Sequence, residues 1–185
     1  MRRVASYGLL ALWILWLLPF LLRRVRSTGI RPSKTAPVSI LGMVLQAASF
    51  PIVFITEHLR AHPPNAWHIA LSFAFGFVSL FLIWSAIPAL GKQWRLQAGV
   101  YADHVLVQSG PYRFVRHPIY ASMLALLLAA GLLVAPWIAI GIALLLMIAG
   151  TEIRVRAEDR LLAERFGQEF ANYKARVPAY IPFLR

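Results

Sequence analysis

The chain has 185 residues, of which 59% are hydrophobic and only 14% are charged, and its formal net charge is +12. Because the apolar residues come in long uncharged blocks, this composition excludes an ordinary soluble domain and indicates a membrane protein. The chain has no cysteine, which excludes disulfide frameworks and thiolate chemistry.

The first half of the chain contains three uncharged apolar blocks of helical length. Val4–Leu22 and Pro37–Ile55 each have 19 residues, and Trp67–Leu90 has 24. About 20 apolar residues cross a hydrocarbon core that is about 30 Å thick, so each block predicts a transmembrane helix. We interpret residues 1–90 as a transmembrane scaffold.

Two shorter apolar blocks follow in the second half. Ile119–Leu133 and Val134–Gly150 form one charge-free stretch that is broken at Ala135-Pro136. We predict a tight helical hairpin, which returns the chain to the side that it left whether or not both helices cross the bilayer fully. The predicted fold class is therefore all-α, a multi-pass membrane protein with about five transmembrane helices, and residues 1–185 form a single membrane domain.

A C-terminal helical segment is predicted after the hairpin. Thr151–Arg165 continues out of the hairpin as a helix, because its apolar residues recur near one face and its charged residues lie on the others. Gly167 interrupts this helix, and Gln168–Ala175 forms a second, shorter one. Residues 91–185 hold the main polar segments, and we expect them to form the cofactor-binding and catalytic part.

The basic residues are distributed unevenly between the two sides that this topology defines. Sixteen of the nineteen Lys and Arg residues fall on one side and three on the other. The positive-inside rule then places the N-terminus outside and the C-terminal tail in the cytoplasm, at the inner membrane if the source is bacterial. Membrane lipid is the expected partner of this charge. No nucleic-acid partner is predicted, because no reading motif accompanies the charge, and the sequence leaves the oligomeric state open.

A polar segment, Gly110–Tyr120, precedes the hairpin. Pro118 disfavours helical geometry at the preceding His117 but suits the first turn of a helix. We therefore predict His117 just before a helix start, where free N–H groups and the positive dipole end attract an anion such as a carboxylate. Arg113 and Arg116 strengthen this field. The alternative is that these three residues only anchor a helix end in lipid headgroups.

A second polar segment lies in the predicted tail helix. Arg154 and Glu158 are four residues apart and share a helical face. The alternative is a surface ion pair of little energetic value, but the helix emerges beside the segment with His117, which favours a functional role.

Three other histidines surround a Pro-Pro loop on the side with little charge, and no metal site is predicted there. They are His58, His62 and His68.

These two segments resemble the isoprenylcysteine carboxyl methyltransferase family. The first block runs from His104 through Gly-Pro-Tyr112 to the Arg-His-Pro-Ile-Tyr motif that ends at Tyr120. The second begins at Arg154 and continues through Glu158-Asp159 to Ile-Pro-Phe183, with Asp159 where the family usually has a second Glu. The Arg-His-Pro-x-Tyr core alone also resembles phospholipid methyltransferases and the C-terminal part of membrane sterol reductases, which bind a nicotinamide cofactor.

The resemblance implies an integral-membrane methyltransferase that uses S-adenosylmethionine in a pocket unlike the soluble Rossmann type. It implies that Arg154 is the catalytic residue that holds the carboxylate of the substrate. The implied contacts of S-adenosylmethionine are Gln97, His104, Val105, Leu106, Val107, Tyr112, His117, Pro118, Ile119, Tyr120 and Glu158.

The predicted function is methyl transfer to a lipophilic acceptor at the cytoplasmic membrane face, most like carboxyl O-methylation of a prenylcysteine-type or other lipidated substrate. A methyl sulfonium is already activated and a carboxylate is ionised near neutral pH, so the reaction needs positioning and exclusion of water rather than a metal. Two alternatives stay open. One is a phospholipid or amine N-methyltransferase, and the other is a nicotinamide-dependent reductase-like or non-catalytic membrane protein.

Overall fold

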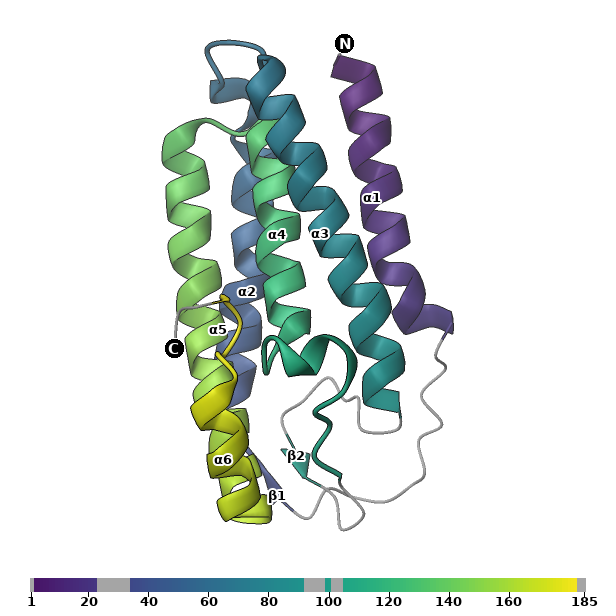
Figure 1. Cartoon of the computed structure of the whole chain (residues 1–185). Coiled ribbons are helices and arrows are strands. Elements are labelled where there is room, and N and C mark those ends of the chain that lie inside the picture. The colour runs from purple at the N-terminus through teal and green to yellow at the C-terminus, as the bar shows by residue number, and fades with distance from the viewer. Residues whose placement is uncertain (1, 23–33, 92–98, 101–104, 183–185) are drawn as a thin grey trace.

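Among the residues that the structure describes, five long helices run alongside one another, and a short sixth helix lies at one end of the bundle (Figure 1). The computed structural model describes residues 2–22, 34–91, 99–100 and 105–182. The elements are α1 (Arg2–Leu22), β1 (Lys34–Thr35), α2 (Val38–Ile55), η1 (Glu57–Leu59), α3 (Ala66–Leu90), β2 (Gly99–Val100), η3 (Gly110–Arg113), α4 (Pro118–Val134), α5 (Trp137–Phe166) and α6 (Gln168–Arg176). The end of the bundle that carries β1, β2, η3 and α6 is called the polar end below.

The predicted helical fold class is confirmed in its main features. By length and composition, α2, α3 and α5 are long and apolar enough to cross a membrane, whereas α1 and α4 offer the shorter apolar stretches Tyr7–Leu22 and Pro118–Val134. The number of helices that cross completely stays a prediction. The strands β1 and β2 form a two-residue antiparallel pair, in which Lys34 faces Val100 and Thr35 faces Gly99.

The predicted hairpin is present, with its turn at Ala135-Pro136. α4 ends at Val134 and α5 begins at Trp137. At this turn the guanidinium of Arg60 donates hydrogen bonds to the carbonyls of Leu132 (2.9 Å) and Ala135 (3.1 Å). These are carbonyls that the end of a helix leaves without partners, so Arg60 caps α4.

The polar tail helix continues the second apolar helix of the hairpin without a break, as predicted. α5 is 30 residues long, and its polar half, residues 151–166, reaches the polar end beside α6 (Figure 1). Gly167 follows with a positive φ of 52°, a backbone conformation that favours glycine, and α6 begins at the next residue. The chain therefore brings its second polar segment back against the bundle on a rigid helix.

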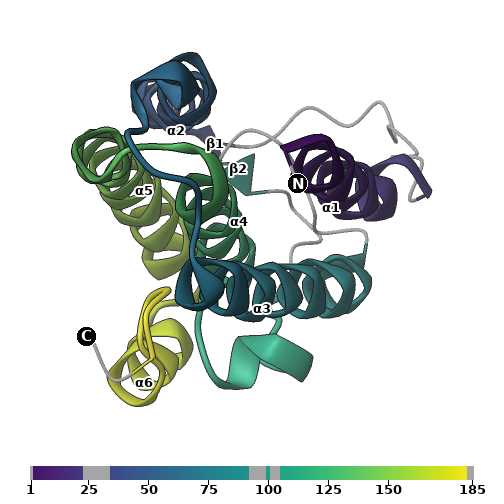
Figure 2. The same cartoon turned by 90° about the horizontal axis from the view of Figure 1, so that it is seen from above.

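Hydrogen bonds from tryptophan side chains attach α1 to the rest of the bundle. Pro19 has no N–H, so the carbonyl of Leu15, four residues earlier, loses its partner within α1. The indole of Trp84 on α3 donates to this carbonyl at 3.0 Å. At the next residue of α1, the indole of Trp16 donates to the hydroxyl of Ser122 on α4 at 2.6 Å. Seen from above, α1 lies beside α3 and on the far side of α4 from α5 (Figure 2).

The backbones of α2 and α5 approach each other closely at two glycines. A Cβ atom added to Gly42 would lie 2.6 Å from the carbonyl oxygen of Gly150, and one added to Gly150 would lie 2.5 Å from the carbonyl oxygen of Gly42. Small residues let helix backbones pack directly in membranes, where lipid removes the hydrophobic drive for association. The two glycines thus set the distance between α2 and the polar half of α5.

We expect Gly150→Ala to lower the free energy of unfolding by about 1–3 kcal/mol, the usual cost of overpacking a close contact. Backbone atoms of α2 fill the space of the new methyl group, so relief requires the helices to separate. The matched control is Gly141→Ala on the same helix, where an added Cβ has nothing within 4 Å. Thermal unfolding in detergent measures both, and equal transition temperatures for the two variants would contradict the prediction.

Candidate active site

The start of α4 is held in place by the C-terminal tail. As predicted, His117 precedes the helix and Pro118 is its first residue. The backbone N–H of Arg116 donates to the carbonyl of Pro178 at 2.9 Å, and the N–H of His117 donates to Ala179 at 2.8 Å. The tail after α6 therefore runs along this segment and holds the backbone of both residues.

Two consecutive carboxylates on α5 contact the two ring nitrogens of His117. Glu158 Oε2 lies 3.2 Å from Nδ1, and Asp159 Oδ1 lies 3.1 Å from Nε2. A neutral imidazole has only one N–H, so two carboxylate contacts require the protonated ring. Burial lowers the pKa of His117, but its hydrogen bonds to Asp159 and Glu158 and their negative charges outweigh burial, and the pKa lies above its usual value.

Asp159 is the centre of a buried group of charges. Besides His117, its Oδ2 atom contacts Arg116 Nη2 at 3.0 Å and Lys174 Nζ at 3.1 Å. The side chains of Asp159 and Arg116 are 7% and 5% exposed, whereas that of Lys174 is 48% exposed. Arg116 also donates to the main-chain carbonyls of Lys174 and Val177. Asp159 is thus committed to contacts within the protein.

Glu158 is more accessible than its neighbour. Its side chain is 24% exposed, it accepts a hydrogen bond from the hydroxyl of Tyr120, and its Oε1 atom lies 3.7 Å from Arg154 Nη2. The Arg154 guanidinium lies over the Tyr120 ring at 5.0 Å, and the His117 ring stacks on the same tyrosine at 5.5 Å between centroids. Carboxylate, guanidinium, imidazole and phenol therefore meet at one place.

These contacts decide between the alternatives that the sequence leaves open. Arg116 and His117 are buried and paired inside the protein, so they do not only anchor a helix end among headgroups. Arg154 is 7% exposed, so its pair with Glu158 is not a surface pair. Arg113 is exposed, and its guanidinium lies over the Phe114 ring at 5.6 Å.

The predicted cofactor contacts are only partly described. Tyr112 is buried beneath α6, where its carbonyl accepts a hydrogen bond of 2.5 Å from the Tyr173 hydroxyl. Pro118 is fully buried and Ile119 is half-buried at the start of α4. Val105, Leu106 and Val107 lie in the segment before η3, with Val105 62% exposed and the other two half-buried. Gln97 and His104 fall outside the described residues, and the roles of all these residues stay predictions.

Three residues of this cluster were missed from the sequence. Gln46 and Thr151 contact each other and lie beside Arg154, and Lys174 reaches Asp159 from α6. Gln46 carried a usable signal, because an amide inside an uncharged membrane helix is rare unless it has partners. Lys174 lies within the second block of the family resemblance, but lysine is common on an exposed helix face and nothing marked it as a partner of Asp159.

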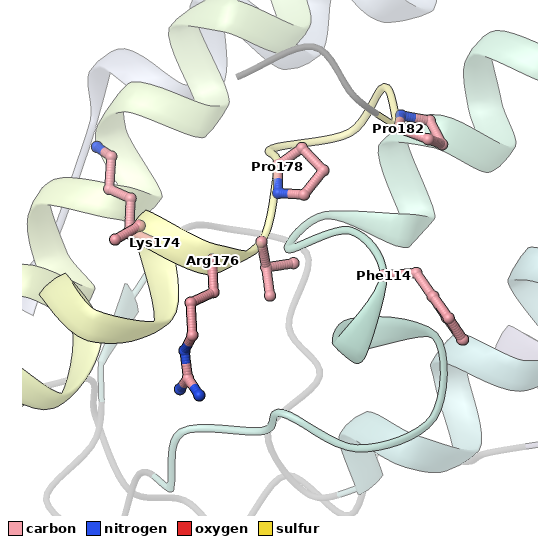
Figure 3. A pocket seen from close by; sticks show the side chains of 7 residues that line it. Phe114, Lys174, Arg176, Pro178 and Pro182 are labelled. Carbon is pink, nitrogen blue, oxygen red and sulfur yellow. The ribbon is translucent and has the colours of Figure 1, made fainter.

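A pocket of about 420 Å³ opens beside this cluster (Figure 3). It lies between Phe114 and the turn that follows α6. Its lining residues are Phe114, Lys174, Ala175, Arg176, Val177, Pro178 and Pro182. None of these is a predicted cofactor contact, and Lys174 alone among them also contacts Asp159 through its side chain. The predicted site residues Glu158 and Arg154 do not line this pocket.

The charge on His117 predicts that stability depends on pH. Because its folded pKa is raised above the unfolded value of about 6.5, its contribution is fully present below pH 6.5 and is lost as the pH rises through the folded value. We expect the melting temperature to fall above pH 6.5, and to fall less steeply in His117→Gln. Melting curves of both proteins between pH 6 and 9 test this, and parallel curves would contradict it.

Comparison with known proteins gives consistent matches. The sequence model of the isoprenylcysteine carboxyl methyltransferase (ICMT) family matches residues 69–164, just over half of the chain. The cobalt-zinc-cadmium resistance protein CzcN of Cupriavidus metallidurans is 33% identical over 151 residues, which are 70% of this chain and 68% of that protein.

Two yeast enzymes are similar over shorter segments. The protein-S-isoprenylcysteine O-methyltransferase of Saccharomyces cerevisiae is 32% identical over 83 residues, or 45% of this chain and 35% of the enzyme. The enzyme of the same name from Schizosaccharomyces pombe is 29% identical over 115 residues, or 60% of this chain and 49% of the enzyme. The matches therefore span about a third and about half of the two yeast proteins.

Proposed function

This chain belongs to the isoprenylcysteine carboxyl methyltransferase family, and we propose that it transfers a methyl group from S-adenosylmethionine to the carboxylate of a lipophilic, prenylcysteine-type acceptor. The observation that carries the proposal is the buried Arg154 beside the partly exposed Glu158, where the apolar part of α5 gives way to its polar half. The pair offers a cationic group and an anionic group at the end of a membrane bundle.

The chemistry of the residues fits S-adenosylmethionine. The two hydroxyl groups of its ribose can donate hydrogen bonds to a carboxylate. Its positive sulfonium is attracted to a carboxylate and to the face of an aromatic ring. Glu158 supplies the carboxylate, and it retains exposure that Asp159 lacks. We propose that Glu158, Tyr120 and the segment before α4 hold the cofactor, together with the other contacts that the family resemblance implies.

Arg154 suits the acceptor. Its planar guanidinium stays charged and holds a carboxylate through two parallel hydrogen bonds. S-adenosylmethionine supplies a methyl group on a positively charged sulfur; transfer joins this carbon to a carboxylate oxygen and leaves the sulfur neutral, so no proton is released. The residues of the chain therefore bind, orient and exclude water, which together supply several kcal/mol.

The lipophilic part of the acceptor belongs in the bilayer. The outward faces of the helices carry large apolar side chains, among them Phe73 and Phe77 on α3, which are more than 70% exposed. Such faces are stable against lipid chains. We propose that the polar end faces the cytoplasm, with the N-terminus outside, and that the acceptor approaches laterally so that only its carboxylate reaches Arg154.

Transfer of labelled methyl from S-adenosylmethionine to a prenylated cysteine by the purified protein tests the function. A phospholipid amine offered in parallel tests N-methylation. A titration with reduced nicotinamide cofactor tests the alternative of a nicotinamide-dependent, reductase-like protein. Methylation of the carboxylate acceptor, with no binding of the nicotinamide, is the expected result. Methylation of the amine alone, or binding of the nicotinamide alone, would overturn the proposal.

A further inference from the structure

Gln46 is an amide side chain in the middle of an uncharged, largely apolar helix. It lies on α2 and is 1% exposed. Its Nε2 atom donates to Thr151 Oγ1 at 2.8 Å, and its Oε1 atom accepts from Arg154 Nη1 at 3.4 Å. A guanidinium has no acceptor, so the amide oxygen must face Arg154 and the amide nitrogen must face the hydroxyl. The orientation of Gln46 is therefore fixed by its partners.

The backbone of α2 is shaped around Arg154 at two positions. A Cβ atom added to Gly42 would lie 2.6 Å from Arg154 Cγ, so the glycine leaves room for the aliphatic stem of the arginine. Gln46 lies one turn further along the same face of α2 and contacts the guanidinium of that arginine. The contact between α2 and α5 thus supports both the stem and the charged group of one side chain.

The partners of Arg154 act on different nitrogens. Glu158 lies near Nη2 and Gln46 bonds Nη1, while the Tyr120 ring lies against the guanidinium plane. The contact to Gln46 carries no net charge, so it orients the guanidinium without neutralising it. A carboxylate at this position would compete with the acceptor for the same hydrogen-bond donors.

We propose that Gln46 is a positioning residue, which holds the Arg154 guanidinium in the orientation that binds the acceptor carboxylate. This inference rests on the proposed function, and it assigns part of the acceptor site to α2, within the segment that the sequence presents as scaffold. Gln46 itself does not touch the acceptor, because both ends of its amide are occupied within the protein.

Kinetics of Gln46→Glu and Gln46→Leu test the inference. We expect Gln46→Leu to raise the acceptor KM about tenfold, the effect of losing one hydrogen bond to a charged group. Gln46→Glu, which keeps the size of the side chain, should raise it further by neutralising Arg154. The affinity for S-adenosylmethionine should change less than about twofold in both. Ser72→Ala is the control, because it removes a buried hydroxyl between α3 and α4 that donates to the carbonyl of Ala129 and not to Arg154 or its partners.

A second measurement separates positioning from a loss of packing. The carboxamide analogue of the acceptor is used as a competitive inhibitor, and its affinity is compared with that of the carboxylate. Gln46→Glu should erase the preference for carboxylate, whereas a partly unfolded protein would lose both affinities equally. An unchanged acceptor KM and an unchanged preference for carboxylate in Gln46→Glu would overturn the inference. If the wild-type protein still methylates the carboxylate acceptor, the proposed function stays intact. No carboxylate methylation by the wild type would overturn both.

Discussion

Replacing Arg154 with alanine is expected to lower kcat/KM for the carboxylate acceptor by roughly 30- to 5,000-fold. Truncating one partner of a buried, hydrogen-bonded charge pair costs about 2–5 kcal/mol, and the acceptor carboxylate would be such a partner. Arg154 is 7% exposed and lies against the Tyr120 ring, so solvent cannot take over its role. Initial rates at varied acceptor concentration give the number.

Two companion variants make this result specific. Arg154→Lys keeps the charge but loses the planar fork, so most of the loss should remain. Glu158→Ala should instead abolish binding of S-adenosylmethionine, which isothermal titration detects without turnover. Arg154→Ala should bind the cofactor with near wild-type affinity. Wild-type turnover in both alanine variants would show that the acceptor and cofactor lie elsewhere.

The site could be predicted from the sequence where local rules act. Pro118 fixes the helix start beside His117, and a spacing of four residues brings Arg154 to Glu158, because both follow from helix geometry. The same rules predicted the hairpin turn and the polar extension of α5.

Contacts between distant segments could not be predicted in this way. Gln46 and Thr151 are 105 residues apart, and they meet because Gly42 and Gly150 let two backbones approach. A single sequence shows each glycine but not its partner. Lys174 likewise reaches Asp159 only because Gly167 turns α6 back along α5. The division into scaffold and catalytic part is therefore blurred at α2, which contributes Gln46 to the cluster.

Replacing Asp159 with asparagine is expected to destabilise the fold by about 3–5 kcal/mol, the cost of removing one partner from a buried ion pair. Asparagine keeps the shape of the side chain but removes the charge that faces Arg116 and the protonated His117. Both of these side chains are less than 10% exposed, so water cannot replace the lost carboxylate. Lys174, which is half-exposed, can return to solvent and adds little to the loss.

Arg156→Ala serves as the matched comparison for Asp159→Asn. Arg156 pairs with Glu152 at 3.3 Å on the same helix, but its side chain is 74% exposed, and such pairs contribute less than about 1 kcal/mol. Asp159→Glu should lie between the two variants, because it keeps the charge but adds a methylene to a filled site. Chemical or thermal unfolding in detergent orders the three proteins. Unfolding requires no cofactor or acceptor, so this test does not depend on what the enzyme methylates. If Asp159→Asn is as stable as Arg156→Ala, the buried charges at the start of α4 do not hold the polar end together.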